Sequence, residues 1–193
     1  MKLGIIGLGS RMSDLLKTFR EADPGLEIAG VVDIDPEAAR GRAPEGAALR
    51  FYETLPELVE QARPDALAIA TRCDGHTRYA IEAARYDLPL FLEKPVATSL
   101  DDAVALERAF EHSRCRALVS FPLRASMLCR RARHLIENGA VGRVENICAL
   151  NYVPYGDVYF LSWYRDYSIT QGLFLQKATH DLDYMMYLAG SPI

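Results

Sequence analysis

The chain has 193 residues, with 50% hydrophobic and 25% charged side chains and a formal net charge of −4 at pH 7. This composition is typical of an ordinary globular domain, and the lack of a basic tract argues against nucleic acid as a main partner. No stretch approaches the roughly 20 apolar residues of a membrane span, and the N-terminus lacks the pattern of a signal peptide. We therefore expect a cytoplasmic protein that binds neither nucleic acid nor a membrane.

Neither the cysteines nor the histidines are spaced like metal ligands. The four cysteines lie in or beside apolar segments and show no Cys-x-x-Cys spacing, so reduced and partly buried thiols are expected. His180, Asp181 and Asp183 cluster in the sequence, but on a helix Asp181 points away from the other two. No metal site is predicted.

Strand and helix patterns alternate through the first 120 residues. The expected strands are Lys2–Ile6, Ile28–Val32, Ala66–Ala70, Leu90–Leu92 and Arg116–Ser120. The expected helices are Ser10–Ala22, a short helix from Pro36, Leu55–Ala62, Thr77–Tyr86 and Leu100–His112, the last capped by Ser99. This alternation predicts an α/β fold, in which helices cover both faces of a parallel sheet.

The pattern changes after Phe121. The expected elements are a helix at about Ala125–Glu137, a strand at Val144–Tyr152, an irregular stretch over residues 153–171 and a helix at about Leu173–Leu188. A single strand leaves two rows of backbone groups unpaired. We therefore expect residues 122–193 to be the start of an incomplete α+β domain, whose further strands follow Ile193 or come from a partner chain.

Gly7-Leu8-Gly9-Ser10-Arg11 follows the first strand and opens a helix, which is the context of a dinucleotide-binding turn. Gly7 permits the tight turn, and Gly9 lets the backbone approach a pyrophosphate at the helix N-terminus, with Ser10 and Arg11 beside it. The third glycine of the pattern is Met12 here, at a position that governs packing more than phosphate contact. Residues 1–121 are therefore interpreted as a Rossmann-type dinucleotide-binding domain.

Asp33 ends the second strand, 24 residues after Gly9. An acid at about this spacing binds the 2′-hydroxyl of a ribose and repels a 2′-phosphate, so NAD is favoured over NADP. The alternative is an aspartate that caps the helix from Pro36, although Asp35 fits that position better.

A short apolar strand runs directly into Glu93-Lys94-Pro95. Pro95 cannot donate to a sheet ladder, so the strand must stop there. Ligands bind at the carboxyl ends of strands in open α/β sheets, which places Lys94 at the mouth of the nucleotide site. The alternative is a solvated lysine on a loop.

Taken together, these motifs resemble the Gfo/Idh/MocA family of oxidoreductases, which act mostly on sugars and cyclitols. Ala70-Thr71 and His76 match the family's Thr-Pro-x-x-x-His, with Arg72 in place of the proline. Residues 135–143 match the segment at the domain crossover, and a later helix carries His180-Asp181. The resemblance covers essentially the whole chain.

The resemblance implies hydride transfer between a nicotinamide cofactor and a hydroxyl-bearing carbon of a sugar or cyclitol. It implies that Lys94 and His180 face the nicotinamide and the substrate alcohol on opposite sides of one pocket. Imidazole titrates near neutral pH and suits the role of base, while an ammonium group can stabilise the alcohol oxygen as it gains negative character. Thr71, His76 and Glu93 are assigned to the cofactor site, although His76 also fits a structural role.

One position departs from the family pattern. Gln176 stands four residues before His180, where many members have an acid. Glutamine can orient an imidazole but cannot ionise, and Lys177 and Asp181 could form an ion pair on a neighbouring face. The alternative functions are therefore a non-redox member of the same fold, either an NAD-using glycosidase or a sugar-responsive regulatory protein, and an inactive member.

Residues 153–171 are rich in aromatic side chains, namely Tyr155, Tyr159, Phe160, Trp163, Tyr164 and Tyr167. Such rings pack on the C–H surfaces of sugars, and Arg165 or Asp157 could bond hydroxyl groups. Trp163, Arg165 and Lys177 are accordingly assigned to substrate binding. Aromatic residues are also enriched at interfaces, so the C-terminal part is expected to form a homo-oligomer.

Overall fold

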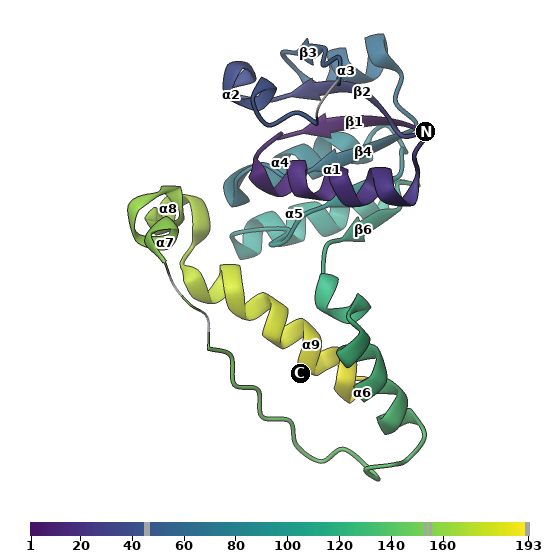
Figure 1. Ribbon diagram of the computed structural model, residues 1–193, viewed down its shortest axis with the longest axis vertical. Helices are drawn as coiled ribbons and strands as arrows, with labels where there is room; N and C mark the ends of the chain where they lie inside the picture. Colours follow the sequence, from purple (N-terminus) through teal and green to yellow (C-terminus); the bar gives the residue numbers. More distant parts are fainter. Residues whose placement is uncertain (45–46, 153, 155, 192–193) are drawn as a thin grey trace. The chain divides into compact units, whose positions relative to one another are not determined.

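The computed structural model describes residues 1–44, 47–152, 154 and 156–191 (Figure 1). The chain forms two compact units, residues 1–119 and 120–193, called the first and second unit below. Among the described residues, no helix is long and apolar enough to cross a membrane.

A parallel sheet of six strands forms the centre of the first unit and confirms the predicted α/β fold. The strands are β1 (Lys2–Ile6), β2 (Glu27–Val32), β3 (Phe51–Tyr52), β4 (Ala66–Ile69), β5 (Leu90–Leu92) and β6 (Ala117–Val119). Their order is β3-β2-β1-β4-β5-β6, and every neighbouring pair is parallel. The order reverses between β1 and β4, and the carboxyl ends of strands at such a switch point bind ligands in open α/β sheets.

Helices cover both faces of this sheet (Figure 1). They are α1 (Ser10–Ala22), α2 (Pro36–Arg40), α3 (Leu55–Ala62), α4 (His76–Ala84) and α5 (Leu100–Glu111). Successive side chains of β1 enter two separate cores, because side chains alternate across a strand. Ile5 packs with Met12 and Leu16 of α1, while Ile6 belongs to the cluster that α3, α4 and α5 cover.

The ends of two helices follow the sequence prediction. Asp35 caps α2 by accepting a hydrogen bond from the Ala38 N–H at 3.0 Å. Ser99 caps α5 by accepting one from the Asp102 N–H at 3.1 Å. Side-chain caps of this kind satisfy backbone donors that have no partner within the helix.

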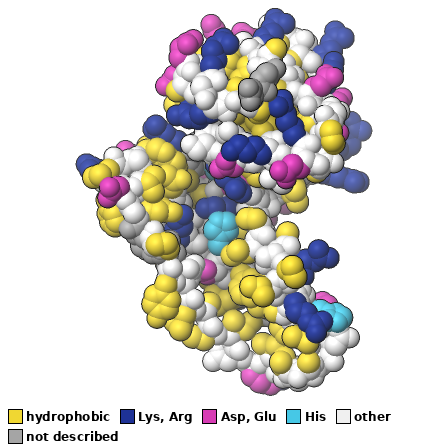
Figure 2. All heavy atoms as spheres, viewed as in Figure 1, with side chains coloured by type: hydrophobic (Ala, Val, Ile, Leu, Met, Phe, Trp, Pro, Cys, Tyr) yellow, Lys and Arg dark blue, Asp and Glu magenta, His cyan; other side chains and the backbone are white. Residues whose placement is uncertain are grey.

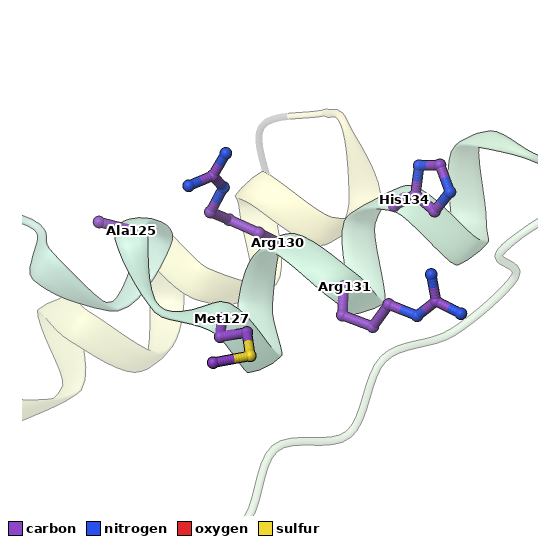
Figure 3. A pocket seen from close by; sticks show the side chains of 5 residues that line it. All are labelled: Ala125, Met127, Arg130, Arg131 and His134. Atoms are coloured by element: carbon purple, nitrogen blue, oxygen red, sulfur yellow. The ribbon is translucent and has the colours of Figure 1, made fainter.

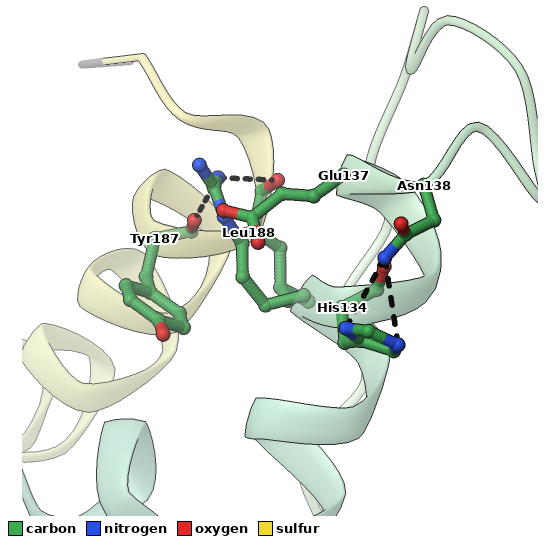
Figure 4. Close-up of polar contacts among 6 residues, drawn as sticks. His134, Glu137, Asn138, Tyr187 and Leu188 are labelled. Atoms are coloured by element: carbon green, nitrogen blue, oxygen red, sulfur yellow. Dashed lines mark hydrogen bonds and ion pairs between the residues drawn. The ribbon is translucent and has the colours of Figure 1, made fainter.

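The second unit is helical over most of its described length. Its elements are η2 (Pro122–Ala125), α6 (Met127–Glu137), α7 (Asp157–Leu161), η3 (Trp163–Arg165), α8 (Tyr167–Thr170), the π-helical turn η4 (Phe174–Ala178) and α9 (Thr179–Ala189). Arg133 of α6 donates to the backbone carbonyls of Tyr187 and Leu188 in α9, at 2.7 and 3.3 Å (Figure 4). Arg124 forms a bidentate ion pair with the buried carboxylate of Asp183. These contacts join α6 and η2 to α9.

The strand predicted at Val144–Tyr152 is wrong. The described residues 143–152 form no strand, and the side chains of Leu150 and Tyr152 are 81% and 91% exposed. β-Propensity is realised only where a segment has a neighbour to pair with and a surface to cover, and the described part of the second unit offers no strand. The prediction that further strands complete this region stays a prediction.

Two further details of the second unit differ from the sequence prediction. The stretch expected to be irregular contains α7, η3 and α8, and the final helix begins with a π-helical turn. Val153 and Tyr155 lie outside the described residues.

Hydrophobic side chains gather on the visible face of this unit (Figure 2), and its exposed apolar residues include Met127, Leu128, Phe160, Leu161 and Phe174.

Candidate functional site

The turn after β1 is built on a close approach of two backbones. Gly7 has a φ of +84°, and a Cβ atom on it would lie 2.7 Å from the Thr71 nitrogen and 2.8 Å from the Thr71 Cα. The Gly7 N–H donates to the Val32 carbonyl at 2.8 Å. Gly7 therefore brings the carboxyl ends of β1, β2 and β4 together, which only a residue without a side chain allows.

Gly9 has a different surrounding from Gly7. A Cβ atom on Gly9 would meet no described atom within 4 Å, so packing within the protein does not account for a glycine here. Gly9 is the N-cap of α1, and in the described structure this cap makes no side-chain hydrogen bond and the first turn has no acidic residue. An open helix N-terminus with free space above its glycine fits the pyrophosphate of a dinucleotide. Ser10 is the first residue of α1 and is exposed.

Asp33 is held by backbone donors on two sides. Its Oδ2 accepts from the Leu8 N–H at 2.7 Å, and its Oδ1 accepts from the Asp35 N–H at 2.9 Å. The carboxylate therefore ties the end of β2 to the glycine turn. Each oxygen retains a lone pair that can accept from a ribose hydroxyl, so this structural role and the predicted ribose contact are compatible.

Glu93 is a buried carboxylate whose partner comes from the glycine turn. Its side chain is 7% exposed, and its Oε1 lies 2.8 Å from the Nε of Arg11, whose side chain is 49% exposed. The structure thus directs the Arg11 Nε toward Glu93, a contact that sequence spacing could not reveal because the two residues are 82 positions apart. Lys94 follows directly and is half-buried.

His76 and Thr77 fix the loop on the other side of Lys94. The Nδ1 and Nε2 atoms of the buried His76 ring lie 2.7 Å from the Pro95 carbonyl and 3.1 Å from the Thr71 carbonyl. Thr77 Oγ1 donates to the Val96 carbonyl at 3.0 Å. Thr77 was not predicted from the sequence, although its place beside His76 in the first turn of α4 is a usable signal.

The charge state of His76 is decided by burial. Loss of hydration lowers the pKa of the ring and outweighs the two carbonyls and Glu93, which favour the protonated form. A neutral ring has one N–H to donate, and the shorter contact favours donation from Nδ1 to the Pro95 carbonyl. His76 therefore serves as a fixed link between the loops that follow β4 and β5.

In the second unit, His180 lies in the first turn of α9. Its ring packs edge-on against Phe121, with centroids 6.0 Å apart and an interplanar angle of 85°. Gln176 lies within the π-helical turn η4 and is 3% exposed. Because a π-turn widens the helix, the four-residue spacing from Gln176 to His180 is not that of a regular α-helical turn, as the sequence had suggested.

The ion pair that the spacing of Lys177 and Asp181 allows does not form. Among the ion pairs of the described residues this one does not occur, and each side chain has another partner. The Lys177 Nζ lies 4.5 Å from the centroid of the Tyr159 ring. Asp181 accepts from the Asn151 amide at 2.9 and 3.2 Å.

Three aromatic rings and Lys177 form one cluster. Trp163 stacks on Tyr164 with centroids 4.0 Å apart, and Tyr159 meets Tyr164 edge-on at 5.2 Å. The exposed Arg165 donates to the Phe160 carbonyl at 3.4 Å and extends the polar border of the cluster. Trp163 and Lys177, both assigned to substrate binding, are thus connected through the rings of Tyr164 and Tyr159.

The hollow in Figure 3 is lined by none of the predicted site residues. It is an open surface formed by η2 and α6, and it is lined by Ala125, Met127, Arg130, Arg131 and His134. Within the described ranges, no three His, Cys, Asp or Glu side chains are grouped so that they could hold a metal ion.

The predicted site residues are distributed over both units. The first unit carries Gly7, Gly9, Ser10, Arg11, Asp33, Thr71, His76, Glu93 and Lys94, and the second carries Trp163, Arg165, Gln176, Lys177 and His180. The prediction that Lys94 and His180 face one pocket stays a prediction.

Acidification should destabilise the protein through His76. Burial keeps the folded-state pKa of the ring below its ordinary value of 6.5, so at about pH 7.5 the ring is neutral in both states and adds no pH dependence. As the pH falls below about 6.5, the unfolded chain takes up a proton that the folded protein does not. The free energy of unfolding then decreases until the pH passes the folded-state pKa.

Urea unfolding followed by circular dichroism tests this at about pH 7.5 and about pH 5.5. His76→Gln should reduce the loss of unfolding free energy between the two pH values. His112→Gln is the matched control, because His112 is exposed at the end of α5. An identical pH dependence in the parent and the His76→Gln protein would contradict the prediction.

Two family models together match most of the chain. Residues 1–121 match the model described as "Oxidoreductase family, NAD-binding Rossmann fold", and residues 129–193 match the GFO/IDH/MocA C-terminal domain. The chain is 25% identical to inositol 2-dehydrogenase 2 of Saccharopolyspora erythraea, over all of this chain and 55% of the relative. It spans about half the length of the curated relatives that it matches.

Solved structures share the fold. The myo-inositol 2-dehydrogenase of Lactobacillus plantarum superimposes with a TM-score of 0.86 at 18% identity, over 98% of this chain and 56% of that chain. The WlbA dehydrogenase of Bordetella pertussis, solved in complex with NADH and UDP-GlcNAcA, gives a TM-score of 0.81 at 23% identity, over 97% and 57% of the two chains. With the glycine turn, Asp33 and the Glu-Lys-Pro loop at the switch point of its sheet, the chain belongs to the Gfo/Idh/MocA family of oxidoreductases and carries that family's NAD-binding Rossmann fold.

Proposed function

We propose that this chain acts as an NAD-dependent dehydrogenase or reductase on a hydroxyl-bearing carbon of a sugar or cyclitol. The observation that carries the proposal is the open turn at Gly9, which lies at the same sheet edge as the loop that holds Lys94. Relatives named as inositol 2-dehydrogenases support the substrate class.

The residues around the switch point fit the cofactor. Gly9 and Ser10 would hold the pyrophosphate through backbone N–H groups at the turn that Gly7 shapes, and Asp33 would accept from the ribose hydroxyls. Thr71 borders the same turn, because its backbone nitrogen would lie only 2.7 Å from a Cβ atom on Gly7. When bound, the nicotinamide supplies the hydride chemistry of the reaction.

The protein residues handle the proton of the substrate alcohol. In oxidation, an imidazole nitrogen of His180 takes the hydroxyl proton, and the Lys94 Nζ stabilises the negative charge that develops on the oxygen. Gln176 would orient the imidazole through its amide. In reduction the same groups act in reverse, with His180 returning the proton.

The aromatic cluster of the second unit is the proposed contact for the substrate. Tyr159, Trp163 and Tyr164 present ring surfaces, and Lys177 adds a hydrogen-bond donor beside them. A polyol has apolar C–H faces and hydroxyl edges, so it can use both kinds of surface. Arg165 would extend the polar side of this contact.

One observation favours a second candidate function. Gln176 stands in place of the acid that would stabilise a protonated His180. A non-redox member of the fold does not require His180 to take a proton from an alcohol, so this replacement would affect it less. The second candidate is therefore an NAD-using glycosidase. A protein that binds NADH, oxidises no polyol and cleaves glycosides would support it against the first.

Gly9→Ala should weaken NADH binding without destabilising the fold. Apart from its chain neighbours, the added methyl group meets no described atom within 4 Å, and it enters the space proposed for the pyrophosphate. We therefore expect the dissociation constant to rise by about tenfold or more, or about 1.4 kcal/mol. Gly7→Ala is the contrasting variant, because its Cβ would clash with Thr71 and should lower the melting temperature. Unchanged NADH affinity in a folded Gly9→Ala protein would contradict the prediction.

NADH should bind more tightly than NADPH, because the charge of Asp33 repels a 2′-phosphate. Asp33→Asn should narrow the difference, because it removes the charge while keeping one side-chain oxygen, which can accept from one of the two backbone donors, Leu8 or Asp35. Asp35→Asn, which changes the neighbouring cap of α2, is the control. The measurement is fluorescence titration with both cofactors, and tighter binding of NADPH to the parent would refute the assignment.

His180→Ala should lower turnover of a polyol by about 10²–10⁴-fold, as expected when a general base is lost, with NADH affinity nearly unchanged. Gln176→Glu should raise turnover by restoring a carboxylate. NADH production against a panel of sugars and inositols is the measurement, and His134→Ala on the exposed face of α6 is the control. Full activity of the His180→Ala protein would exclude His180 as the base.

A further inference from the structure

We propose that Arg11 is a positioning residue for Lys94, acting through Glu93 rather than as a ligand of the cofactor phosphates. Its ion pair would fix the glycine turn and the Glu-Lys-Pro loop to each other. The inference rests on the proposed function, because it assigns to Lys94 the contact with the substrate oxygen. It concerns residues of the first unit alone.

The pair spans the switch point of the sheet. Arg11 is the second residue of α1, which follows β1, and Glu93 is the first residue after β5. β4 lies between β1 and β5 in the sheet, so the Arg11 side chain reaches past the end of β4. The Glu93 N–H also donates to the Ile69 carbonyl of β4 at 3.0 Å. Glu93 is thus tied to β4 by its backbone and to α1 by its side chain.

Glu93 is more deeply buried than Arg11, so Glu93 depends on the ion pair more than Arg11 does. The Glu93 side chain is 7% exposed and that of Arg11 is 49% exposed. A buried carboxylate is strongly unfavourable without a positive partner, whereas a half-exposed guanidinium can be hydrated. Loss of Arg11 therefore leaves the charge of Glu93 uncompensated, and the loop must shift to bring that charge to water.

The position of Lys94 depends on this link because its other neighbours are already fixed. His76 and Thr77 bind the carbonyls of Pro95 and Val96, which follow Lys94. Glu93 precedes Lys94 and is fixed by Arg11. A shift of Glu93 is therefore passed to Lys94, and a displacement of about 1 Å in a catalytic group can lower a rate by about 10²-fold.

The test compares Arg11→Gln with Arg114→Gln in the full chain. Arg114 also pairs with a carboxylate, that of Asp87 at 3.1 Å, but both residues precede their strands and lie at the opposite edge of the sheet. Three quantities are measured: turnover of a polyol at saturating NAD, the dissociation constant of NADH, and hydrogen exchange at the amides of Lys94 and Val96.

We expect Arg11→Gln to lower turnover by about 10–100-fold, to change NADH affinity by less than about threefold, and to speed exchange at both amides. Arg114→Gln should change none of these. In Arg11→Gln/Glu93→Gln the buried charge is gone, so the loss of turnover should be smaller than the product of the two single losses.

The proposal is overturned if Arg11→Gln raises the NADH dissociation constant by about tenfold or more while turnover at saturating cofactor is retained, which is the behaviour of a phosphate ligand. Multiplicative losses in the double variant would also overturn it. If the parent turns over no polyol, the proposed function fails, but exchange still decides the positioning role. Faster exchange in Arg11→Gln supports it and unchanged exchange refutes it. If Arg11→Gln does not fold, the same three quantities are measured on Arg11→Lys, which keeps the positive charge but lacks the Nε atom, and the same outcomes support or overturn the proposal.

Discussion

The arrangement of the first unit depends on the close approach of β1 and β4 at their carboxyl ends. Gly7 lies so near Thr71 that a Cβ atom would come within 2.7 Å of its backbone nitrogen. This contact brings the turn after β1 beside the loop after β4 at the point where the strand order reverses. A side chain at position 7 would separate the two ends, and the ligand-binding edge would lose its geometry.

Polar side chains then fasten each loop at this edge to the next. Asp33 links β2 to the glycine turn, Arg11 links that turn to Glu93, and His76 links the loops after β4 and β5. These contacts are buried or half-buried, where removal of one partner costs more than the net gain of forming the pair. Their main effect is therefore to specify one arrangement of the loops, more than to add stability.

The sequence predicts the first unit well because its central strands β1 and β4 are buried on both faces and the neighbouring β5 is largely buried. Continuous apolar runs such as Leu90–Leu92 identify such strands, and the caps at Asp35 and Ser99 mark helix starts by local chemistry. The two-residue strand β3 has too few residues to give a pattern. The pairing of Arg11 with Glu93 depends on the folded sheet, which no local signal records.

Prediction fails where a segment's structure depends on neighbours that its own pattern does not specify. Val144–Tyr152 has the composition of a strand, but the described part of the second unit provides no strand beside it. Lys177 and Asp181 are spaced for an ion pair, but Lys177 instead contacts the ring of Tyr159 and Asp181 accepts from the amide of Asn151. The spacing of apolar residues in the sequence likewise does not indicate the π-helical turn that contains Gln176.

Gln176 stands where many family members have an acid, so the side chain at this position has no negative charge that could stabilise a protonated His180. Asp183 lies three residues after His180, a spacing that places two side chains on one helix face, but both of its oxygens accept from Arg124. Asp181 is engaged by Asn151. The carboxylates nearest to His180 in the sequence are therefore already committed to structural contacts. A buried glutamine avoids the desolvation of a carboxylate at position 176. In the proposed reaction, the positive charge of a protonated His180 would therefore be balanced from outside α9, or the proton would be passed on to solvent.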